Sequence, residues 1–153
     1  MSATTQREVT ICPLGLGEQP ELEQMYASFE PKRAAMGLPP GDPVACRNWL
    51  NRLLLDGINL VARAEGRIVG HLVLAPSRLA AEMAVFVHQD WRNHGVGSQL
   101  VASALEEARL RGLRYVWVLL TSDHTSHTVP WLSRFGFQSG GAMPGEVTMI
   151  RIL

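Results

Sequence analysis

The residues best suited to chemistry lie between positions 85 and 100, where an apolar run meets two glycines. Arg92, Gly95 and Gly97 stand in the spacing Arg-x-x-Gly-x-Gly. Glycine permits a sharp turn and a close approach of the backbone to a ligand. The first amides of the helix that follows lack intrahelical partners and lie at the positive end of its dipole. The pattern predicts a site for phosphate or pyrophosphate, to which Arg92 can add a charged fork.

Two other glycine-rich phosphate sites fit this segment poorly. A P-loop requires Lys-Ser or Lys-Thr after its last glycine, whereas Gly97 is followed by Ser98-Gln99 and the chain has a single lysine, Lys32. A dinucleotide fingerprint requires Gly or Ala where Leu100 stands. A purely structural glycine turn remains as the alternative.

Length and charge limit the partners that the chain can have. Its 153 residues carry 14 acidic and 14 basic side chains, so no overall field draws it to nucleic acid or to an anionic membrane. This length is typical of one domain. No apolar run approaches a membrane span, and residues 1–7 lack the apolar core of a signal peptide. We therefore expect a cytoplasmic protein that binds neither nucleic acid nor membrane.

No metal site is predicted. Cys12 and Cys46 stand far apart and match no metal-ligand spacing, so we expect buried free thiols in a reducing compartment. Asp123, His124 and His127 form a polar cluster. Two histidines three residues apart with one aspartate lack a distant third ligand, and a cap for the next helix is the favoured reading.

Apolar spacing in the first half predicts a strand, two helices and a hairpin. Residues 8–14 alternate as a short strand. A helix over 18–29 follows, because its apolar residues recur at i, i+3, i+4 and i+7: Leu22, Met25, Tyr26 and Phe29. A second helix is capped by Asp42 and ended by Gly57. Extended runs at 59–64 and 67–74 flank Glu65-Gly66, a two-residue hairpin turn.

The second half holds the elements that position the anion turn. An extended run over 81–87 leads into it. The helix that leaves it buries one apolar stripe: Val96, Leu100, Val101, Ala104, Leu105 and Ala108. Residues 114–120 form an apolar strand typical of a sheet interior, and 146–152 form a last strand. No repeat or linker interrupts the chain, so residues 1–153 are read as a single domain.

Motif and element order together resemble the GNAT superfamily of N-acetyltransferases. The spacing from Arg92 to Gly97 matches its Arg/Gln-x-x-Gly-x-Gly/Ala signature, and Gly136-Phe137 matches its late Gly-Phe pair. The resemblance covers nearly the whole chain. It implies an α/β (α+β) fold: a mixed, mostly antiparallel sheet of six to seven strands, flanked by about four helices. The fourth strand would be bulged and splayed from the fifth.

The same resemblance implies acetyl-coenzyme A (acetyl-CoA) as cosubstrate. Backbone groups of Val85, Phe86 and Val87 would hydrogen-bond the pantetheine arm. The pyrophosphate would be held by the amides of the turn: Arg92, Asn93, His94, Gly95, Val96, Gly97 and Ser98.

The implied reaction is acetyl transfer to a primary amine by direct attack in a ternary complex. A neutral amine attacks the thioester, a donor such as a backbone amide stabilises the oxyanion, and the thiolate benefits from a proton. Glu82, early on the fourth strand, is the candidate base that takes the amine proton directly or through water. A solvated charge on one face of the strand is the equal alternative for Glu82.

The sequence departs from the family at its general acid. The tyrosine that often lies four residues before the late glycine is replaced by Leu132. Two alternatives follow: the thiolate leaves unassisted, or the proton comes from Ser126, Ser133 or a histidine of the 123–127 cluster, of which His124 is the candidate. Loss of activity is a further alternative.

The acceptor cannot be named from the sequence. The proline-rich connection 37–43 would border its site but carries no dense acidic patch for a polycation, so a small-molecule amine is favoured over a protein amine. A homodimer is a possible assembly, since the last strand would offer an edge for pairing. The rival function is a non-catalytic acyl-CoA-binding sensor or interaction module.

Overall fold

The computed structural model describes residues 7–31, 39–121 and 125–153. In chain order its elements are β1 Thr10–Pro13, α1 Gln19–Ala27, α2 Pro43–Asp56, β2 Ile58–Ala64, β3 Arg67–Ser77, β4 Ala80–Val87, the 3-10 turn η1 Gln89–Trp91, α3 Val96–Leu110, β5 Tyr115–Thr121, α4 Thr125–Ser133, β6 Gln138–Met143 and β7 Glu146–Ile152. No helix among these residues is both long and apolar enough to span a bilayer.

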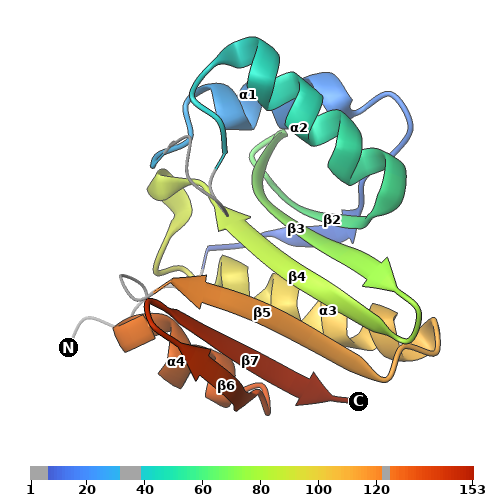
Figure 1. Cartoon of the computed structure of the whole chain (residues 1–153). Helices are drawn as coiled ribbons and strands as arrows, with labels where there is room; N and C mark the ends of the chain where they lie inside the picture. Colours follow the sequence, from blue (N-terminus) through green and yellow to red (C-terminus); the bar gives the residue numbers. More distant parts are fainter. Residues whose placement is uncertain (1–6, 32–38, 122–124) are drawn as a thin grey trace.

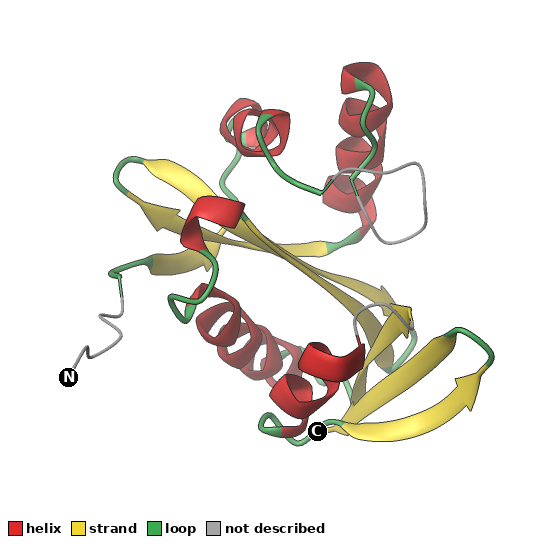
Figure 2. Ribbon diagram, turned by 90° about the vertical axis from the view of Figure 1, so that its left-hand side faces the viewer, coloured by secondary structure: helices red, strands yellow, loops and turns green. Residues whose placement is uncertain are grey.

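The strands of the described residues form one seven-stranded sheet in the order β1-β2-β3-β4-β5-β7-β6. All neighbours are antiparallel except β4 and β5, which are parallel. Helices α1 and α2 cover one face of the sheet, and α3 and α4 lie on the other (Figures 1 and 2). The expected fold class is therefore confirmed.

The last strand is not an edge of the sheet. β7 lies between β5 and β6, so the edges are β1 and β6. The expectation that the last strand offers an edge for pairing is wrong, because the shorter β6 folds back antiparallel onto it and occupies that side.

Each face of the sheet has its own apolar core. All six α3 residues of the predicted stripe are buried, none more than 8% exposed. On the other face α1 contributes Leu22, Met25 and Tyr26, and Phe29 beyond its end is also buried. A buried side chain of this size contributes about 1.5–3 kcal/mol of transfer free energy, so these stripes fix which face each helix presents to the sheet.

Local signals at the element ends are confirmed. The carboxylate of Asp42 accepts from the Ala45 amide at 2.9 Å, and Gly57 ends α2. Glu65 and Gly66 have φ of 52° and 76°, the two positive values that a type I′ hairpin turn requires. The cysteines differ from expectation: Cys12 and Cys46 form no disulfide bond, but both are only half-buried, at the edge of the core that α1 and α2 form with the sheet.

Strands β4 and β5 pair over a short stretch and then separate. Ala80–Glu82 of β4 lie opposite Tyr115–Trp117 of β5, whereas β5 continues beside β7 as far as Thr121 (Figure 1). The predicted splay is therefore present. The predicted bulge in the fourth strand is not: the β3–β4 register runs unshifted from Gly70↔Val87 to Ser77↔Ala80. A shift occurs instead in the β2–β3 pairing, between Ala62 and Arg63.

Candidate functional site

The pleat of β4 determines which backbone groups face the gap beside β5. The amide of His88 donates to the carbonyl of Val69 at 2.9 Å, which makes these two a hydrogen-bonded pair of the antiparallel ladder. Such pairs alternate along the strand. The backbone groups of Phe86 and Ala84 are consequently directed to β3. Those at the intervening positions are directed to β5: Met83, Val85 and Val87.

This alternation changes the predicted set of backbone ligands. Val85 and Val87 turn their N–H and C=O groups toward the gap, but Phe86 uses its own in the ladder opposite His71. Met83, which the sequence analysis did not name, is the third residue whose backbone groups face the gap. β4 beyond Glu82 is therefore a half-paired strand, ready to accept an extended partner along its free side.

At the end of this gap the anion turn opens α3. Asn93 and Gly95 have φ of 63° and 80°, and Gly95 is the N-cap. The first amide that bonds back into the helix is that of Gln99, to the carbonyl of Gly95 at 3.1 Å, and no side chain caps this end. The amides of Val96, Gly97 and Ser98 are thus free to bind an anion, with the helix dipole behind them.

Gly97 is placed where the backbone comes close to an indole. A Cβ at this position would lie 3.3 Å from Cζ2 of Trp131 and 3.6 Å from Cγ2 of Val87. Trp131, on α4, donates its Nε1–H to the hydroxyl oxygen of Ser98 at 2.9 Å. The Ser98 hydroxyl hydrogen remains for another acceptor. A side chain at 97 would therefore crowd both the indole and the approach to the free amides.

His94 adds a second sign that this turn is incomplete without a ligand. Its Nδ1 is buried and has no hydrogen-bond partner among the described residues. Buried polar atoms are nearly always paired, so a bound group that supplies the missing partner fits this position. Free amides, a glycine whose Cβ would crowd an indole, and an unpaired ring nitrogen together suit a phosphate-bearing ligand.

Arg92 does not point a free fork at the turn. Its Nε donates to the carbonyl of Val87 at 2.9 Å, and its Nη2 donates to the carbonyl of Glu30. The guanidinium carbon lies 5.3 Å from the centre of the Phe29 ring. Partial burial lowers the pKa of Arg92 from its ordinary value, and no carboxylate of the described residues forms an ion pair with it. Two nitrogens of the Arg92 side chain therefore already bind carbonyls, and its contact to phosphate stays a prediction.

Glu82 lies at the point where β4 and β5 part. Its side chain is half-buried and has no hydrogen bond or ion pair within the described part of the chain. Alternate residues of a strand share a face, so Glu82 projects to the same side as Phe86, toward α1 and α2. It therefore faces away from α3, on the side of the sheet opposite the anion turn.

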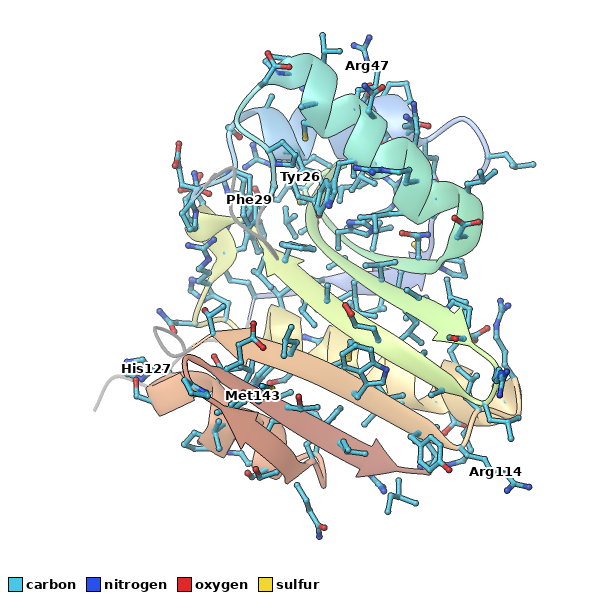
Figure 3. All side chains as sticks on the ribbon, in the orientation of Figure 1. Tyr26, Phe29, Arg47, Arg114, His127 and Met143 are labelled. Atoms are coloured by element: carbon cyan, nitrogen blue, oxygen red, sulfur yellow. The ribbon has the colours of Figure 1, made fainter. Side chains whose placement is uncertain are left out.

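The second catalytic candidate, His124, lies outside the described residues, as does Asp123. His127 is exposed on α4. It lies near the C-terminal end of β5, whereas Arg114 lies at the other end of that strand (Figure 3). No group of three His, Cys, Asp or Glu side chains that could hold a metal is found in the described residues.

No tyrosine hydroxyl is available at the usual place for a general acid. Leu132 is 1% exposed and packs in the core on the α3 side of the sheet. Tyr26 is buried between α1 and the sheet, where its hydroxyl bonds Nδ1 of His71 at 2.7 Å. Tyr115 begins β5, at the end where β4 and β5 are still paired. These are the two tyrosines of the sequence.

Comparison with known proteins agrees with this geometry. A model described as the acetyltransferase (GNAT) family matches residues 22–137. An amino-acid acetyltransferase from Pectobacterium atrosepticum is 36% identical over 76 residues, which are 49% of this chain and only 15% of that relative.

Solved structures share the fold. A ribosomal-protein-alanine N-acetyltransferase from Brucella melitensis superposes with a TM-score of 0.74 at 23% identity, over 94% of this chain and 99% of that one. The yncA protein of Salmonella typhimurium, a putative acetyltransferase solved with its cofactor acetyl-CoA, has a TM-score of 0.74 at 21% identity, over 95% and 94% of the two chains.

Proposed function

The chain belongs to the GNAT family of acetyltransferases, and on that basis we propose that it transfers the acetyl group of acetyl-CoA to a primary amine of a small molecule. Membership of this family identifies the chain as an acyltransferase. The acceptor and the mechanism are our proposal. The observation that carries it is the gap beside β4, where β4 has no paired strand beyond Glu82, and which ends at the uncapped N-terminus of α3.

The chain's residues would hold the cosubstrate from both ends of this gap. Backbone groups of Met83 and Val85 and the N–H of Val87 would pair with the amide groups of the pantetheine arm as a neighbouring strand does. The carbonyl of Val87 already accepts from Arg92. The pyrophosphate would accept from the amides of the turn over 92–98, with the hydroxyl of Ser98 and the ring of His94 as side-chain partners.

Catalysis would then depend on groups on both sides of β4. Bound acetyl-CoA supplies a thioester carbonyl that an amine can attack. An amide that is directed into the gap and is not paired with the pantetheine arm would donate to the carbonyl oxygen as it gains charge. The new carbon–nitrogen bond forms as the carbon–sulfur bond breaks, and the carboxylate of Glu82 would take the amine proton directly or through water. The sulfur leaves as thiolate, without a tyrosine to protonate it.

A small-molecule acceptor is supported by two observations. The curated relative is an amino-acid acetyltransferase, although the match covers a small part of that protein. Glu82 approaches the gap from the α1 and α2 side with its carboxylate unpaired, which suits a single cationic amine. The ribosomal-protein-alanine N-acetyltransferase among the structural neighbours supplies the competing acceptor class, a protein amine.

The test has two stages. Isothermal titration with acetyl-CoA, CoA and ATP should show saturable binding of the CoA species and none of ATP. Release of free thiol is then followed with a panel of amino acids, simple alkylamines and a peptide beginning with alanine. Turnover with amino acids or alkylamines supports the proposal, and turnover with the peptide alone refutes the acceptor class. Absence of CoA binding would refute the whole assignment.

The second candidate function is a non-catalytic acyl-CoA-binding module. It is favoured by the buried Leu132, which leaves no hydroxyl where the family commonly places its general acid. This candidate predicts saturable CoA binding with no thiol release above the hydrolytic background for any amine in the panel. A cytoplasmic location and a homodimer remain part of the proposal; size-exclusion chromatography with light scattering checks the latter.

A further inference from the structure

The face of the sheet beneath α1 and α2 is covered only in part. Figure 1 shows that these two helices lie over β2 and β3, whereas no described helix lies over β5 or β7 on that side. Side chains alternate along a strand, and Val116 and Leu120 belong to the core on the α3 side. The uncovered side of β5 therefore carries the alternate residues: Tyr115, Trp117 and Leu119.

The uncovered side of β5 continues onto β7 as an apolar surface. Tyr115 and Leu119 are 44% and 38% exposed. On β7, Ile152 lies opposite Tyr115 and is 65% exposed, and Ile150 lies opposite Trp117. These residues form what we call the open face: Tyr115, Trp117, Leu119, Ile150 and Ile152. Contiguous exposed apolar side chains mark binding sites, whereas single ones do not, so the open face is a candidate binding surface beside the gap.

Trp117 is the residue of the open face that lies closest to Glu82. The two stand opposite each other in the last parallel pair before β4 and β5 separate. Paired strands lie about 4.8 Å apart, so the two side chains project side by side at the closed end of the gap. Ala84, the next β4 residue on this face, carries only a methyl group. The gap therefore begins between a carboxylate from β4 and an indole from β5.

Trp117 has no side-chain partner within the described residues that would occupy its indole. It is half-buried, and it makes neither a ring contact nor a side-chain hydrogen bond with the part of the chain that the structure describes. Ile150 is directed toward β6, because a Cβ at Gly140 would lie 2.8 Å from its Cγ1. The other three tryptophans each contact a ring, a cation or a hydroxyl: Trp49, Trp91 and Trp131. Trp117 thus retains apolar surface that a ligand can cover.

We propose that Trp117 and Leu119 determine acceptor specificity, and that the preferred acceptor is a primary amine with an apolar substituent. The inference rests on the proposed function, because it takes Glu82 as the group that the amine approaches. A cosubstrate with its pyrophosphate at the start of α3 has its thioester toward the other end of the gap, where Glu82 lies. An amine held between the thioester and Glu82 places its substituent against Trp117 and Leu119. The unpaired carboxylate suits the amine, and the indole and the leucine suit an apolar body.

Four amines of graded polarity test this inference, with acetyl-CoA saturating and free thiol as the readout. They are 2-phenylethylamine, 3-methylbutylamine, ethylamine and 2-(2-aminoethoxy)ethanol, of which the last has a long but polar body. One methylene in an apolar pocket changes kcat/KM by about 10- to 200-fold. Because the open face covers a ligand from one side, the lower end applies, and the two apolar amines should exceed ethylamine about tenfold in kcat/KM. The polar amine should not exceed ethylamine.

Trp117→Ala is the first test variant. The ratio of kcat/KM for 2-phenylethylamine to that for ethylamine should fall from about ten to below about two, mainly through a higher KM for the apolar amine. Leu119→Ser is the second variant, at an exposed position where folding is less at risk, and it should lower the same ratio about threefold. Calorimetry with CoA on each variant checks that its fold and its cosubstrate site are intact.

Tyr115→Ala is the matched control. Tyr115 is an aromatic residue of the same strand and the same face, but it lies two residues, about 7 Å, farther from the gap than Trp117. Its loss removes a similar exposed apolar area from the open face. This variant should keep the wild-type ratio, because the substituent of a small amine at Glu82 does not reach it.

Three results would overturn the inference while the proposed function survives. They are equal kcat/KM for all four amines, an unchanged ratio in Leu119→Ser and in a Trp117→Ala chain that binds CoA, and a loss in Tyr115→Ala as large as that in Trp117→Ala. Light scattering tests a second copy of the chain as the occupant. A wild-type dimer that either test variant converts to monomer, with the order of amines unchanged, would assign the open face to that copy and overturn the inference. Absence of thiol release with every amine would overturn both proposals, so ethylamine turnover separates the two kinds of failure.

Discussion

His71 makes acid stability a direct test of the packing beneath α1. The side chain is fully buried on β3, and burial lowers the pKa of His71 from 6.5 to about 3. Its tautomer follows from its partners. Asn59 uses its amide nitrogen to donate to the carbonyls of Leu53 and Gly57, so its oxygen accepts from Nε2–H of His71 at 2.7 Å. Nδ1 is then the acceptor for the hydroxyl of Tyr26.

The direction in which stability changes with pH follows from the direction of the pKa shift of His71. In the unfolded chain His71 binds a proton near pH 6.5, whereas the folded chain resists it down to about pH 3. Its contribution to the free energy of unfolding is therefore complete above pH 6.5 and is lost as the pH falls from 6.5 toward 3. At about 1.4 kcal/mol per pH unit, acidification from about pH 7.5 to about pH 5 should remove about 2 kcal/mol.

The assay compares urea unfolding of the wild type with that of His71→Gln at both pH values. Groups other than His71 are common to both proteins, so their contributions cancel in the difference. The variant should be less stable at neutral pH, because ring hydrogen bonds are lost, but its stability should fall with acid by about 2 kcal/mol less than that of the wild type. Equal pH dependence in the two proteins, or an NMR titration of the His71 ring above pH 5, would refute the reasoning.

Four further predictions concern the site and the fold. Gly97→Glu should raise the Kd for CoA at least about 100-fold by calorimetry, because its side chain crowds Trp131 and brings a negative charge to the free amides, and unchanged affinity would leave the turn a structural one. Glu82→Gln should lower kcat about 100-fold near neutral pH, with partial recovery as pH rises and CoA affinity unchanged, and a wild-type rate would remove Glu82 as the base. Trp131→Phe, which frees the oxygen of Ser98, should weaken CoA binding about threefold to tenfold, and no weakening would show that the hydroxyl is not used. Asp42→Ala should lower the free energy of unfolding by about 1 kcal/mol in urea titration, through loss of the α2 cap, without affecting CoA binding.

Features that depend on neighbouring residues were predictable from the sequence. The α3 stripe follows from a period of 3.6 residues, and all six of its members are buried. The cap at Asp42 and the turn at Glu65-Gly66 follow from backbone preferences of single residues and pairs. The anion turn belongs to the same class, because glycine spacing and the unpaired amides of a helix start are local properties.

Features that depend on pairing across the chain were not predictable. Which backbone groups of β4 face the gap is determined by its register with β3. A shift of one residue would direct Ala84 and Phe86 to the gap and turn Met83, Val85 and Val87 away from it. The absence of a bulge in β4 has the same origin. The position of β7 inside the sheet also required knowledge of where β6 pairs.

Arg92 shows most clearly the difference between features that the local sequence determines and features that depend on contacts across the chain. Its residue type and spacing indicated a phosphate contact, since a guanidinium beside a glycine turn can donate charged hydrogen bonds to phosphate oxygens. The tertiary structure instead brings the carbonyl of Glu30, 62 positions earlier in the sequence, within reach of its side chain. The sequence determined the anion turn, because its amides and glycines act locally. Only the fold decided what the side chains around that turn bind, because their partners come from the end of β4, the segment after α1, and α4.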